Sequence, residues 1–341
     1  MRITVLTGGS TPERDVALAG AAQVVAALRQ RQHSVMVVDT VNGPLSSADE
    51  RSVLTASVGK QPPTAEELAQ LAGRERLESM ITLPEIRDAD VVFLVLHGKQ
   101  GEGGEIQALL DLAGIVYTGS GPLGSAVAMD KDIAKRLFVA SGLPTPSWQM
   151  WPLSPAEKSR LEFPIVVKPS KVGSSVGLTV AHSPDDIQPA VELAERYDSD
   201  VMLEQYIDGR EFTVGVLAMQ ALAVGEIIPQ HATFDYECKY TPGMTREIFP
   251  ADITDDLADE LRRLALQAHR ALKLRDFSRI DFKVNDGEGA LCLEANTLPG
   301  LTGTSLLPQS AAASGIPFDD LCERICQAAL QRVTEQSLPV R

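Results

Sequence analysis

The chain has 341 residues, of which 44% are apolar and 5% aromatic, and a formal net charge of −15. This length and composition are typical of an α/β protein with two or three domains. The negative charge excludes nucleic acid as the main partner, because a phosphate backbone requires a basic surface. No apolar run reaches the length of a membrane span, and no secretory signal pattern opens the chain.

The first part of the chain predicts a parallel sheet. Its expected elements are strands at 2–7, 33–38 and 91–96 and helices at 14–31 and 105–112. The first two strands and the helix between them form a β-α-β unit, which requires parallel strands. Residues 41–86 are polar, contain prolines and two short helical patterns, and are expected to form an insertion at the domain edge. His97 follows the third strand, at the carboxyl end where open α/β sheets bind ligands.

A dinucleotide-binding fold is the alternative for this part. Gly8 and Gly9 follow the first strand, but the G-x-G-x-x-G spacing is absent. Asp39 ends the second strand, where a ribose-binding acid would stand, yet a purely structural turn is the favoured interpretation. Glu13, at the start of the next helix, is explained by the helix dipole alone. A lone His97 is more often structural, although its position favours a site.

The middle of the chain and its C-terminal part predict a small α+β unit and further antiparallel strands. A composition shift at 117–122 marks a domain boundary, and a polar loop is expected at 231–249. The expected helices are 129–141, 185–195, 253–272 and 318–332, and the expected strands are 163–168, 177–181, 201–205, 211–217 and 223–228.

Four scattered cysteines lack the spacing of a zinc site. They are Cys238, Cys292, Cys322 and Cys326. Cys322 and Cys326 lie four residues apart on the last expected helix, which favours buried small apolar groups. We therefore expect a reduced, cytoplasmic protein of the size of an enzyme.

A glycine-rich loop at 173–177 lies between two expected strands. Its small residues and consecutive N–H groups could hold phosphate oxygens, although it lacks the Walker A pattern. A hairpin loop without a ligand explains this segment equally well. Lys168, five residues before Gly173, supplies a cation on the preceding strand and favours the phosphate interpretation.

The most informative pattern is a hairpin of two strands joined by a turn at 285–289. Side chains alternate along a strand, so each strand has a polar face and an apolar face. The polar faces are expected to carry Arg279, Asp281 and Lys283 on the first strand and Cys292, Glu294 and Asn296 on the second.

These polar faces predict a metal site. The hairpin brings together the carboxylates of Asp281 and Glu294 and the amide of Asn296, beside Arg279. Oxygen ligands suit Mg²⁺ or Mn²⁺ rather than zinc, and Mg²⁺ commonly also binds substrate phosphates, so a nucleotide is expected. A solvated polar face would explain an isolated hairpin. The polar, turn-rich run 297–305 directly after the second strand favours a functional site.

Taken in chain order, these motifs resemble one family, the D-alanine–D-alanine ligases of the ATP-grasp superfamily. The resemblance extends over nearly the whole chain apart from 41–86. Its motifs are Gly8–Val16, Leu96–Glu102, Tyr117–Gly121, Met129–Lys131, Val167–Pro169, Gly173–Gly177, Glu204–Val214, Asp235–Tyr240, Ser278–Asp281, Glu294–Gly300 and Thr304–Pro308. So many motifs in one order make the resemblance specific.

The resemblance implies an ATP-grasp fold in three parts. These are an N-terminal Rossmann-like parallel-sheet domain at 1–120, a small central α+β subdomain at 121–204, and a C-terminal mixed-sheet catalytic subdomain at 205–341. The implied reaction joins two D-alanines for peptidoglycan precursor synthesis, through D-alanyl phosphate, with release of ADP and phosphate. The family also implies a homodimer. Ligation to D-lactate or D-serine, a specialised dipeptide ligase and a non-enzymatic or dinucleotide-binding protein are the alternatives.

Matching residues take their roles from the family. For ATP, the resemblance implies that Lys131 and Lys168 contact the phosphates and that Gly173, Ser174 and Ser175 cover them. It implies that the adenine pocket consists of Glu204, Gln205, Tyr206 and Ile207. It also implies that Glu211 contacts the ribose. It implies that two Mg²⁺ or Mn²⁺ ions bind to Asp281, Glu294 and Asn296.

For the two amino acids, the resemblance implies that Glu13 receives the first ammonium group and that His97 lies near the first carboxylate. The oxyanion would be stabilised by Arg279 and the N–H of Gly300, and the second D-alanine would be held by Ser305 and Leu306. A mobile loop would carry Lys239 and Tyr240, with Tyr240 directed toward Ser174 and Glu13. Tyr240 after Lys239 favours a D-alanine acceptor.

The sequence departs from the family pattern at four positions. Ala17 replaces a serine, Gly103 an aspartate, Ala108 a glycine and Cys238 an alanine. None of these positions is an implied metal ligand or the arginine, so catalysis is expected to be intact. Ala17 and Gly103 flank the side of the first substrate, so that pocket is where differences from the family are expected.

Overall fold

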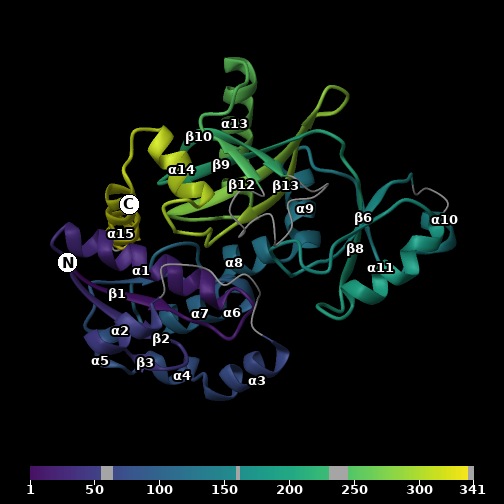
Figure 1. The fold of residues 1–341 in the computed structure, drawn as a ribbon. Helices are drawn as coiled ribbons and strands as arrows, with labels where there is room; N and C mark the ends of the chain where they lie inside the picture. The colour runs from purple at the N-terminus through teal and green to yellow at the C-terminus, as the bar shows by residue number, and fades with distance from the viewer. Residues whose placement is uncertain (55–63, 159–161, 230–244, 337–341) are drawn as a thin grey trace.

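The computed structural model describes residues 1–54, 64–158, 162–229 and 245–336. These residues form three sheets, which follow one another along the chain and are flanked by helices (Figure 1). The predicted α/β class is therefore confirmed. None of the described helices is both long enough and apolar enough to cross a membrane.

The N-terminal sheet consists of β1 (Arg2–Thr7), β2 (Ser34–Asp39), β3 (Gly43–Pro44) and β4 (Val91–Leu94), in the order β3-β2-β1-β4. β1 pairs in parallel with β2 and with β4, and only the short edge strand β3 is antiparallel. Helix α1 (Arg14–Gln30) connects β1 to β2 and buries Leu18, Val25 and Leu28. The predicted β-α-β unit is confirmed.

The segment predicted as an insertion, 41–86, contains four short helices in its described part. They are α2 (Ser47–Val53), α3 (Ala65–Arg74), α4 (Leu77–Met80) and α5 (Pro84–Arg87). α2 and α3 each begin with a capping box, in which the N-cap hydroxyl and the acid three residues later satisfy each other's backbone N–H groups. Met80 and Ile86 are buried in the core of the N-terminal sheet, so this segment is anchored to the domain.

Four helices lead from β4 toward the central sheet. They are α6 (Gly98–Glu102), α7 (Glu105–Leu112), α8 (Pro122–Met129) and α9 (Lys131–Ala140). α8 was not predicted, and it begins with a proline at its first turn, where the missing N–H costs nothing. Asp130 caps α9 by accepting the N–H of Ile133. Lys131 therefore stands at the first position of a helix.

The central sheet is small and antiparallel, with the order β5-β8-β6-β7. Its strands are β5 (Trp148–Met150), β6 (Ile165–Pro169), β7 (Thr179–Ala181) and β8 (Val201–Gln205), with the helices α10 (Pro155–Lys158) and α11 (Ile187–Ala194) and a 3₁₀ turn, η1 (Pro184–Asp186). Helix α11 lies beside this sheet (Figure 1). A separate core that includes Val167, Val191 and Leu203 joins the two.

The C-terminal sheet has the order β11-β10-β9-β12-β13. Its strands are β9 (Arg210–Leu217), β10 (Gln220–Pro229), β11 (Thr245–Ile248), β12 (Phe277–Asn285) and β13 (Gly289–Asn296). Each described pair of neighbours is antiparallel, whereas the family resemblance implied a mixed sheet. The prediction of a loop through 249 is wrong at β11, because its residues pair with the edge of β10, a long-range contact. Helix α13 (Asp255–Ala271) buries Leu261 and Leu264 against this sheet.

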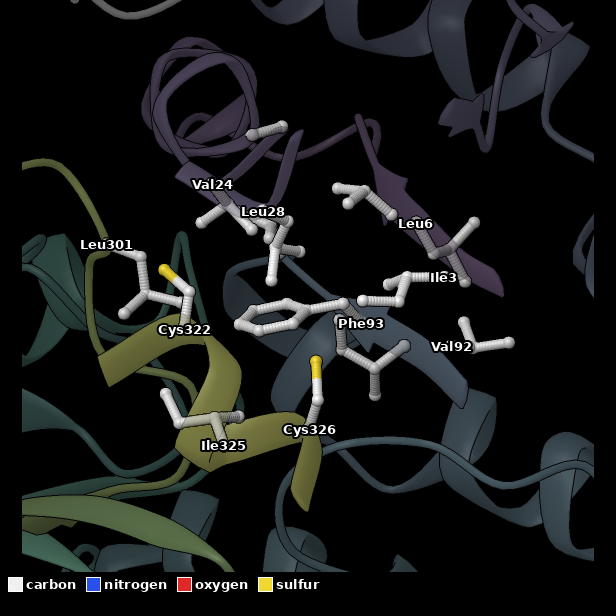
Figure 2. Packing of buried hydrophobic residues seen from close by; sticks show 14 of the residues in the cluster. Ile3, Leu6, Val24, Leu28, Val92, Phe93, Leu301, Cys322, Ile325 and Cys326 are labelled. Carbon is white, nitrogen blue, oxygen red and sulfur yellow. The ribbon is translucent and has the colours of Figure 1, made fainter. Parts of the chain in front are cut away.

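The chain ends with α14 (Leu306–Ala313) and α15 (Phe318–Gln336), and α15 returns to the N-terminal sheet beside α1 (Figure 1). Cys322, Ile325 and Cys326 pack around Phe93 and Leu28 in one core (Figure 2). Burial raises the pKa of the Cys326 thiol to about 12, and that of Cys322 rises for the same reason. The prediction that these cysteines are buried apolar groups is confirmed.

Candidate active site

A cavity of about 140 Å³ lies between the central and the C-terminal sheets. One wall comes from β6, β8 and the loop after β6, and the opposite wall comes from β9, β12 and β13. Among its lining residues are all the described side chains that the resemblance linked to ATP: Lys131, Lys168, Gly173, Ser174, Ser175, Glu204, Gln205, Tyr206, Ile207 and Glu211. Asp281 and Glu294 line the same space, so the predicted nucleotide and metal residues are neighbours.

The hairpin of β12 and β13 forms one side of this cavity. Arg279 pairs with Asn296 and Asp281 with Glu294, but Phe282 pairs with Cys292. Leu293 is therefore an extra residue, a β-bulge that interrupts the alternation of faces. The prediction of one uninterrupted polar face is wrong at this point. Cys292 is buried in the apolar core with Phe282, and Leu293 lines the cavity instead.

Asp281 is the centre of the polar network on the hairpin. Arg279 donates two hydrogen bonds to its carboxylate, with distances of 3.0 and 2.8 Å, and Asn296 Nδ2 donates a third at 2.9 Å. Thr213 on β9 donates a fourth at 2.7 Å. Burial alone would lower the pKa of Arg279, but the Asp281 carboxylate more than offsets this, so the pKa is raised and the guanidinium stays charged.

The donor atoms of this hairpin fit a hard cation. Asp281 and Glu294 face each other across the strands, and the amide oxygen of Asn296 is a third possible ligand. In the described ranges no cluster of three or more His, Cys, Asp or Glu side chains could hold a metal by itself. A cation here would thus share its coordination with a substrate, as Mg²⁺ does with nucleotide phosphates. Lys131 Nζ lies 3.4 Å from Glu294 Oε2.

A buried cluster of charges supports the nucleotide wall. Glu204 lies between two lysines, with Lys135 Nζ 2.7 Å from one carboxylate oxygen and Lys168 Nζ 2.5 Å from the other. Burial alone would raise the pKa of Glu204, but the two lysines outweigh it and the pKa is lowered. Burial lowers the pKa of Lys135, and Glu204 offsets only part of that effect. The geometry supports an ionised Glu204 that orients Lys168 toward the cavity.

Sequence reasoning missed Lys135. The signal was present, because Lys135 stands four residues after Lys131 on α9, and residues at that spacing share one helix face. Its Nζ also donates to Thr145 Oγ1 at 2.7 Å and lies 5.2 Å from the centre of the Trp148 ring. No single sequence motif connects these distant partners.

The loop after β6 reaches the N-terminal domain at Glu13. Ser174 donates a hydrogen bond from Oγ to Glu13 Oε1. Ser174 and Ser175 both have left-handed backbones, with φ of +54° and +56°, a conformation that is strained for residues other than glycine. Successive turns of this kind can gather N–H groups into an anion-binding concavity. The loop therefore connects the nucleotide cavity with the helix start at Glu13.

Two titratable groups, the buried His97 and the half-buried Glu102, lie near Glu13 and Arg279. His97 is 8% exposed, and its Nε2 atom has no hydrogen-bond partner in the part of the chain that the structure describes. Burial lowers the pKa of His97, so its ring is neutral at neutral pH. Glu102 accepts the N–H groups of Gly98 at 3.1 Å and of Leu298 at 3.4 Å. Burial, with a further contribution from Glu13, raises the pKa of Glu102 to about 8.

Glu102 belongs to a motif that the sequence analysis recognised, but no role was predicted for it. A glutamate at the end of a short helix is usually exposed, but Glu102 is half-buried and accepts the N–H of Leu298 from the C-terminal part. Its position connects the His97 loop to the segment that carries Gly300. The missed residue therefore lies between two predicted parts of the site.

The segment after β13 ends at the N-terminus of α14. A Cβ atom on Gly300 would lie 2.8 Å from Ser305 Oγ, so a larger residue there would displace the Ser305 side chain. Ser305 is the N-cap of α14 and accepts the N–H of Thr302 at 3.1 Å, and Leu306 is the first helical residue. N–H groups at such a helix start favour a carboxylate. Lys239, Tyr240 and Cys238 lie outside the described residues.

The dinucleotide alternative does not fit the turn after β1. Asp39 is fully buried and forms an ion pair of 2.5 Å with Arg14, and it also accepts the N–H of Val41 at 2.8 Å. A Cβ atom on Gly8, where φ is +102°, would lie 2.4 Å from Asp39 Oδ1. The carboxylate of Asp39 is thus used to hold the turn, which confirms the structural interpretation.

Three sheets, with a cavity between the last two that contains lysines, a glycine-rich loop and the carboxylates of a hairpin, are the arrangement of an ATP-grasp ligase. Two family models match the chain, "D-ala D-ala ligase N-terminus" over residues 2–120 and "D-ala D-ala ligase C-terminus" over residues 137–327. The chain therefore belongs to the D-alanine–D-alanine ligase family.

Known proteins agree with this membership. The D-alanine–D-alanine ligase of Geobacter sulfurreducens is 40% identical over 332 residues, which cover 96% of this chain and 94% of the relative. The solved D-alanine–D-alanine ligase of Bacillus anthracis complexed with ATP aligns with a TM-score of 0.79 and 30% identity over 99% of both chains. VanG, a D-Ala:D-Ser ligase of Enterococcus faecalis, aligns with a TM-score of 0.79 and 25% identity over 96% of this chain and 98% of that one.

Proposed function

We propose that this chain joins two D-alanines to D-alanyl-D-alanine for peptidoglycan precursor synthesis, with ATP as the energy source. One arrangement carries the proposal. The cavity that contains the residues assigned to ATP also contains Asp281 and Glu294 of the carboxylate hairpin, where Asp281 is held by Arg279, and Ser174 in its wall donates a hydrogen bond to Glu13. A carboxylate is a poor acyl donor, so the γ-phosphoryl group of ATP first passes to the first D-alanine and ADP leaves. The amine of the second D-alanine then attacks the acyl carbon, and phosphate leaves.

The nucleotide would lie in the cavity between the two sheets. Lys131 and Lys168 supply positive charge to its phosphates, and residues 173–175 cover them. The cavity also contains the proposed adenine-binding run 204–207 and the proposed ribose ligand Glu211, whose carboxylate lies 3.3 Å from Lys283 Nζ. The buried Glu204 keeps Lys168 in place, because the ion pair restricts an otherwise flexible side chain.

Two Mg²⁺ or Mn²⁺ ions would be held by Asp281, Glu294 and Asn296 together with the phosphates. When bound, these ions neutralise the charge that gathers on the transferring phosphoryl oxygens. The chain itself orients the ligands, since Arg279 and Thr213 fix the Asp281 carboxylate from two sides.

The first D-alanine would place its ammonium group at Glu13 and its carboxylate near His97. A neutral His97 can donate or accept a hydrogen bond without adding a second charge to the site. The charged Arg279 and the N–H of Gly300 would stabilise the oxyanion that forms when the amine attacks. Ser305 and Leu306, at the start of α14, would hold the carboxylate of the second D-alanine.

Several predictions extend beyond the chemistry of the described residues. Lys239 and Tyr240 are proposed to close over the acceptor and exclude water.

The homodimer, the cytoplasmic location and the division at residues 120 and 204 remain predictions. The packing of α15 on the N-terminal core means that the last helix contributes to the first domain, wherever the boundaries are drawn.

Related ligases can differ in the second substrate, which accepts the D-alanyl group. The chain also aligns well with the VanG D-Ala:D-Ser ligase, so the identity of this acceptor needs its own test. We expect D-alanyl-D-alanine from ATP, Mg²⁺ and D-alanine alone. With equal D-alanine and D-lactate, or D-alanine and D-serine, the same dipeptide should dominate at neutral pH. Mass spectrometry of the products measures this directly. A majority of depsipeptide or of D-alanyl-D-serine would overturn the D-alanine acceptor and leave the ligase class standing.

A further inference from the structure

We infer that Glu75, on the segment predicted as an insertion, is a positioning residue for the first amino-acid subsite. It joins the loop after β1, which leads to Glu13, to the loop after β4, which carries His97. The inference rests on the proposed function in one respect, because Glu13 and His97 are the residues proposed to bind the first D-alanine. No function had been predicted for residues 41–86, so this assignment would give the segment a role in the reaction.

One carboxylate oxygen of Glu75 receives a hydrogen bond from each loop. Ser10 donates from Oγ to Glu75 Oε2 at 3.0 Å, and Gln100 donates from Nε2 to the same oxygen. The two donors also contact each other. Gln100 Nε2 donates to Ser10 Oγ at 2.6 Å, and the N–H of Ser10 donates to Gln100 Oε1 at 2.9 Å. Three side chains from separate parts of the sequence thus form a closed triangle.

Two members of this triangle are close in sequence to Glu13 and His97, the residues proposed to bind the first D-alanine. Ser10 precedes Glu13 by three residues, in the turn that leads into α1. Gln100 lies in α6, between His97 and Glu102. The two segments also touch at His97 itself, where Thr11 Oγ1 lies 3.4 Å from its carbonyl oxygen. If the contact between Ser10 and Gln100 shifts, the distance between Glu13 and His97 should change. These are the residues proposed to bind the ammonium group and the carboxylate of the first D-alanine.

Anchoring the segment does not require Glu75. Met80 and Ile86 bury the segment in the core of the N-terminal sheet, and Asn42 Nδ2 donates to Asp39 Oδ2 on β2 at 2.7 Å. The other oxygen of Glu75, Oε1, is buried without a hydrogen-bond partner among the described residues. A buried carboxylate oxygen without a partner costs stability. The carboxylate of Glu75 is therefore better explained by a role in holding Ser10 and Gln100 in place than by a contribution to the stability of the fold.

The test compares Glu75→Ala with Glu78→Ala in the full-length chain. Glu78 is an exposed acid on the same segment, so its removal matches the change in charge without touching the triangle. Initial rates at varied ATP and D-alanine give separate KM values for ATP and for the first and second D-alanine. We expect Glu75→Ala to raise the KM for the first D-alanine by about tenfold, while the KM for ATP changes by less than about twofold. Glu78→Ala should behave as wild type.

Rescue provides the second measurement. Glu75→Gln keeps an oxygen that can accept from Ser10 and Gln100, so its KM for the first D-alanine should stay within about threefold of wild type. If Glu75→Ala fails to fold, Ser10→Ala removes one donor and should raise the same KM selectively. An unchanged KM for the first D-alanine, or equal rises in all three KM values, would overturn the inference. Failure of wild type to make any dipeptide would instead overturn the proposed function.

Discussion

The hairpin of β12 and β13 and the region around Glu13 are built in opposite ways. Arg279, Asp281 and Asn296 lie on two adjacent strands, and ladder hydrogen bonds set their spacing. Glu13 and His97 instead follow different strands of the N-terminal sheet, and Ser174, in the loop after β6 of the central sheet, donates a hydrogen bond to Glu13. Local pairing thus fixes the groups proposed for phosphoryl transfer, and long-range contacts fix those proposed for substrate binding. Substitutions in the two regions should therefore affect different kinetic constants.

The largest effect is expected on the hairpin. Asp281→Asn and Glu294→Gln should each lower turnover by about 1,000-fold, or roughly 4 kcal/mol, because each removes an anionic ligand from the proposed metal site. ADP release at saturating substrates measures the loss. Asp281→Asn also weakens the 2.8 Å ion pair with Arg279, whereas the side chain of Glu294 is 27% exposed and lies 3.4 Å from Lys131 Nζ. Near-normal turnover of a folded Glu294→Gln at ordinary Mg²⁺ would remove the metal assignment.

Glu13→Gln should act on substrate binding instead. Loss of the carboxylate charge is expected to raise the KM for the first D-alanine by about 30-fold, because the ammonium group loses its ion pair. ATP affinity should stay within about twofold, because Glu13 is not a lining residue of the cavity and Glu13→Gln keeps a side-chain oxygen that can accept the hydrogen bond of Ser174. Calorimetry with Mg²⁺ and ATP provides the comparison. A parallel loss of ATP affinity would show that the two regions are not separate.

Lys168→Ala tests the nucleotide wall between the two regions. Its charge is directed at phosphate and at Glu204, so ATP binding should weaken by about tenfold and the KM for D-alanine should change less. Lys171→Ala is the matched control, because that lysine is 39% exposed and pairs with Asp200 away from the cavity. Equal ATP affinity in the Lys168→Ala variant and wild type would refute the phosphate role.

The two regions also differ in how well the sequence predicts them. Alternation along each strand correctly brought Asp281 and Glu294 together on the hairpin, because both strands and their turn are continuous in sequence. The exact pairing was not predicted, since an uninterrupted hairpin with this turn would pair Asp281 with Leu293, and the register shift between Asp281 and Phe282 brings Asp281 opposite Glu294. Alternation failed at Cys292 and Leu293, since a β-bulge depends on how the chain packs beyond the pair. Glu102 could not be assigned for a different reason. It accepts the N–H of Leu298, which lies nearly 200 positions further along the chain.

Glu102 allows a smaller effect to be measured as a pH dependence of stability. The pKa of Glu102 is about 8 in the folded chain, against 4.5 for an ordinary glutamate, so folding takes up a proton between these values. Stability should therefore fall as pH rises through this range. Glu102→Gln lacks this loss, so its stability relative to wild type should be higher at about pH 9 than at about pH 5. Urea unfolding at both pH values measures it, and parallel stability curves would contradict the raised pKa.

The hairpin and the loops around Glu13 are proposed to act on one group, the carboxylate of the first D-alanine. The most direct test labels both oxygens of that carboxylate with ¹⁸O and analyses the phosphate released with the dipeptide. A carboxylate oxygen that attacks the γ-phosphorus stays with the phosphoryl group when the amine later displaces it. Each released phosphate should therefore carry one ¹⁸O atom. Phosphate without the label would contradict the acyl phosphate and, with it, the proposed joint action of the two regions.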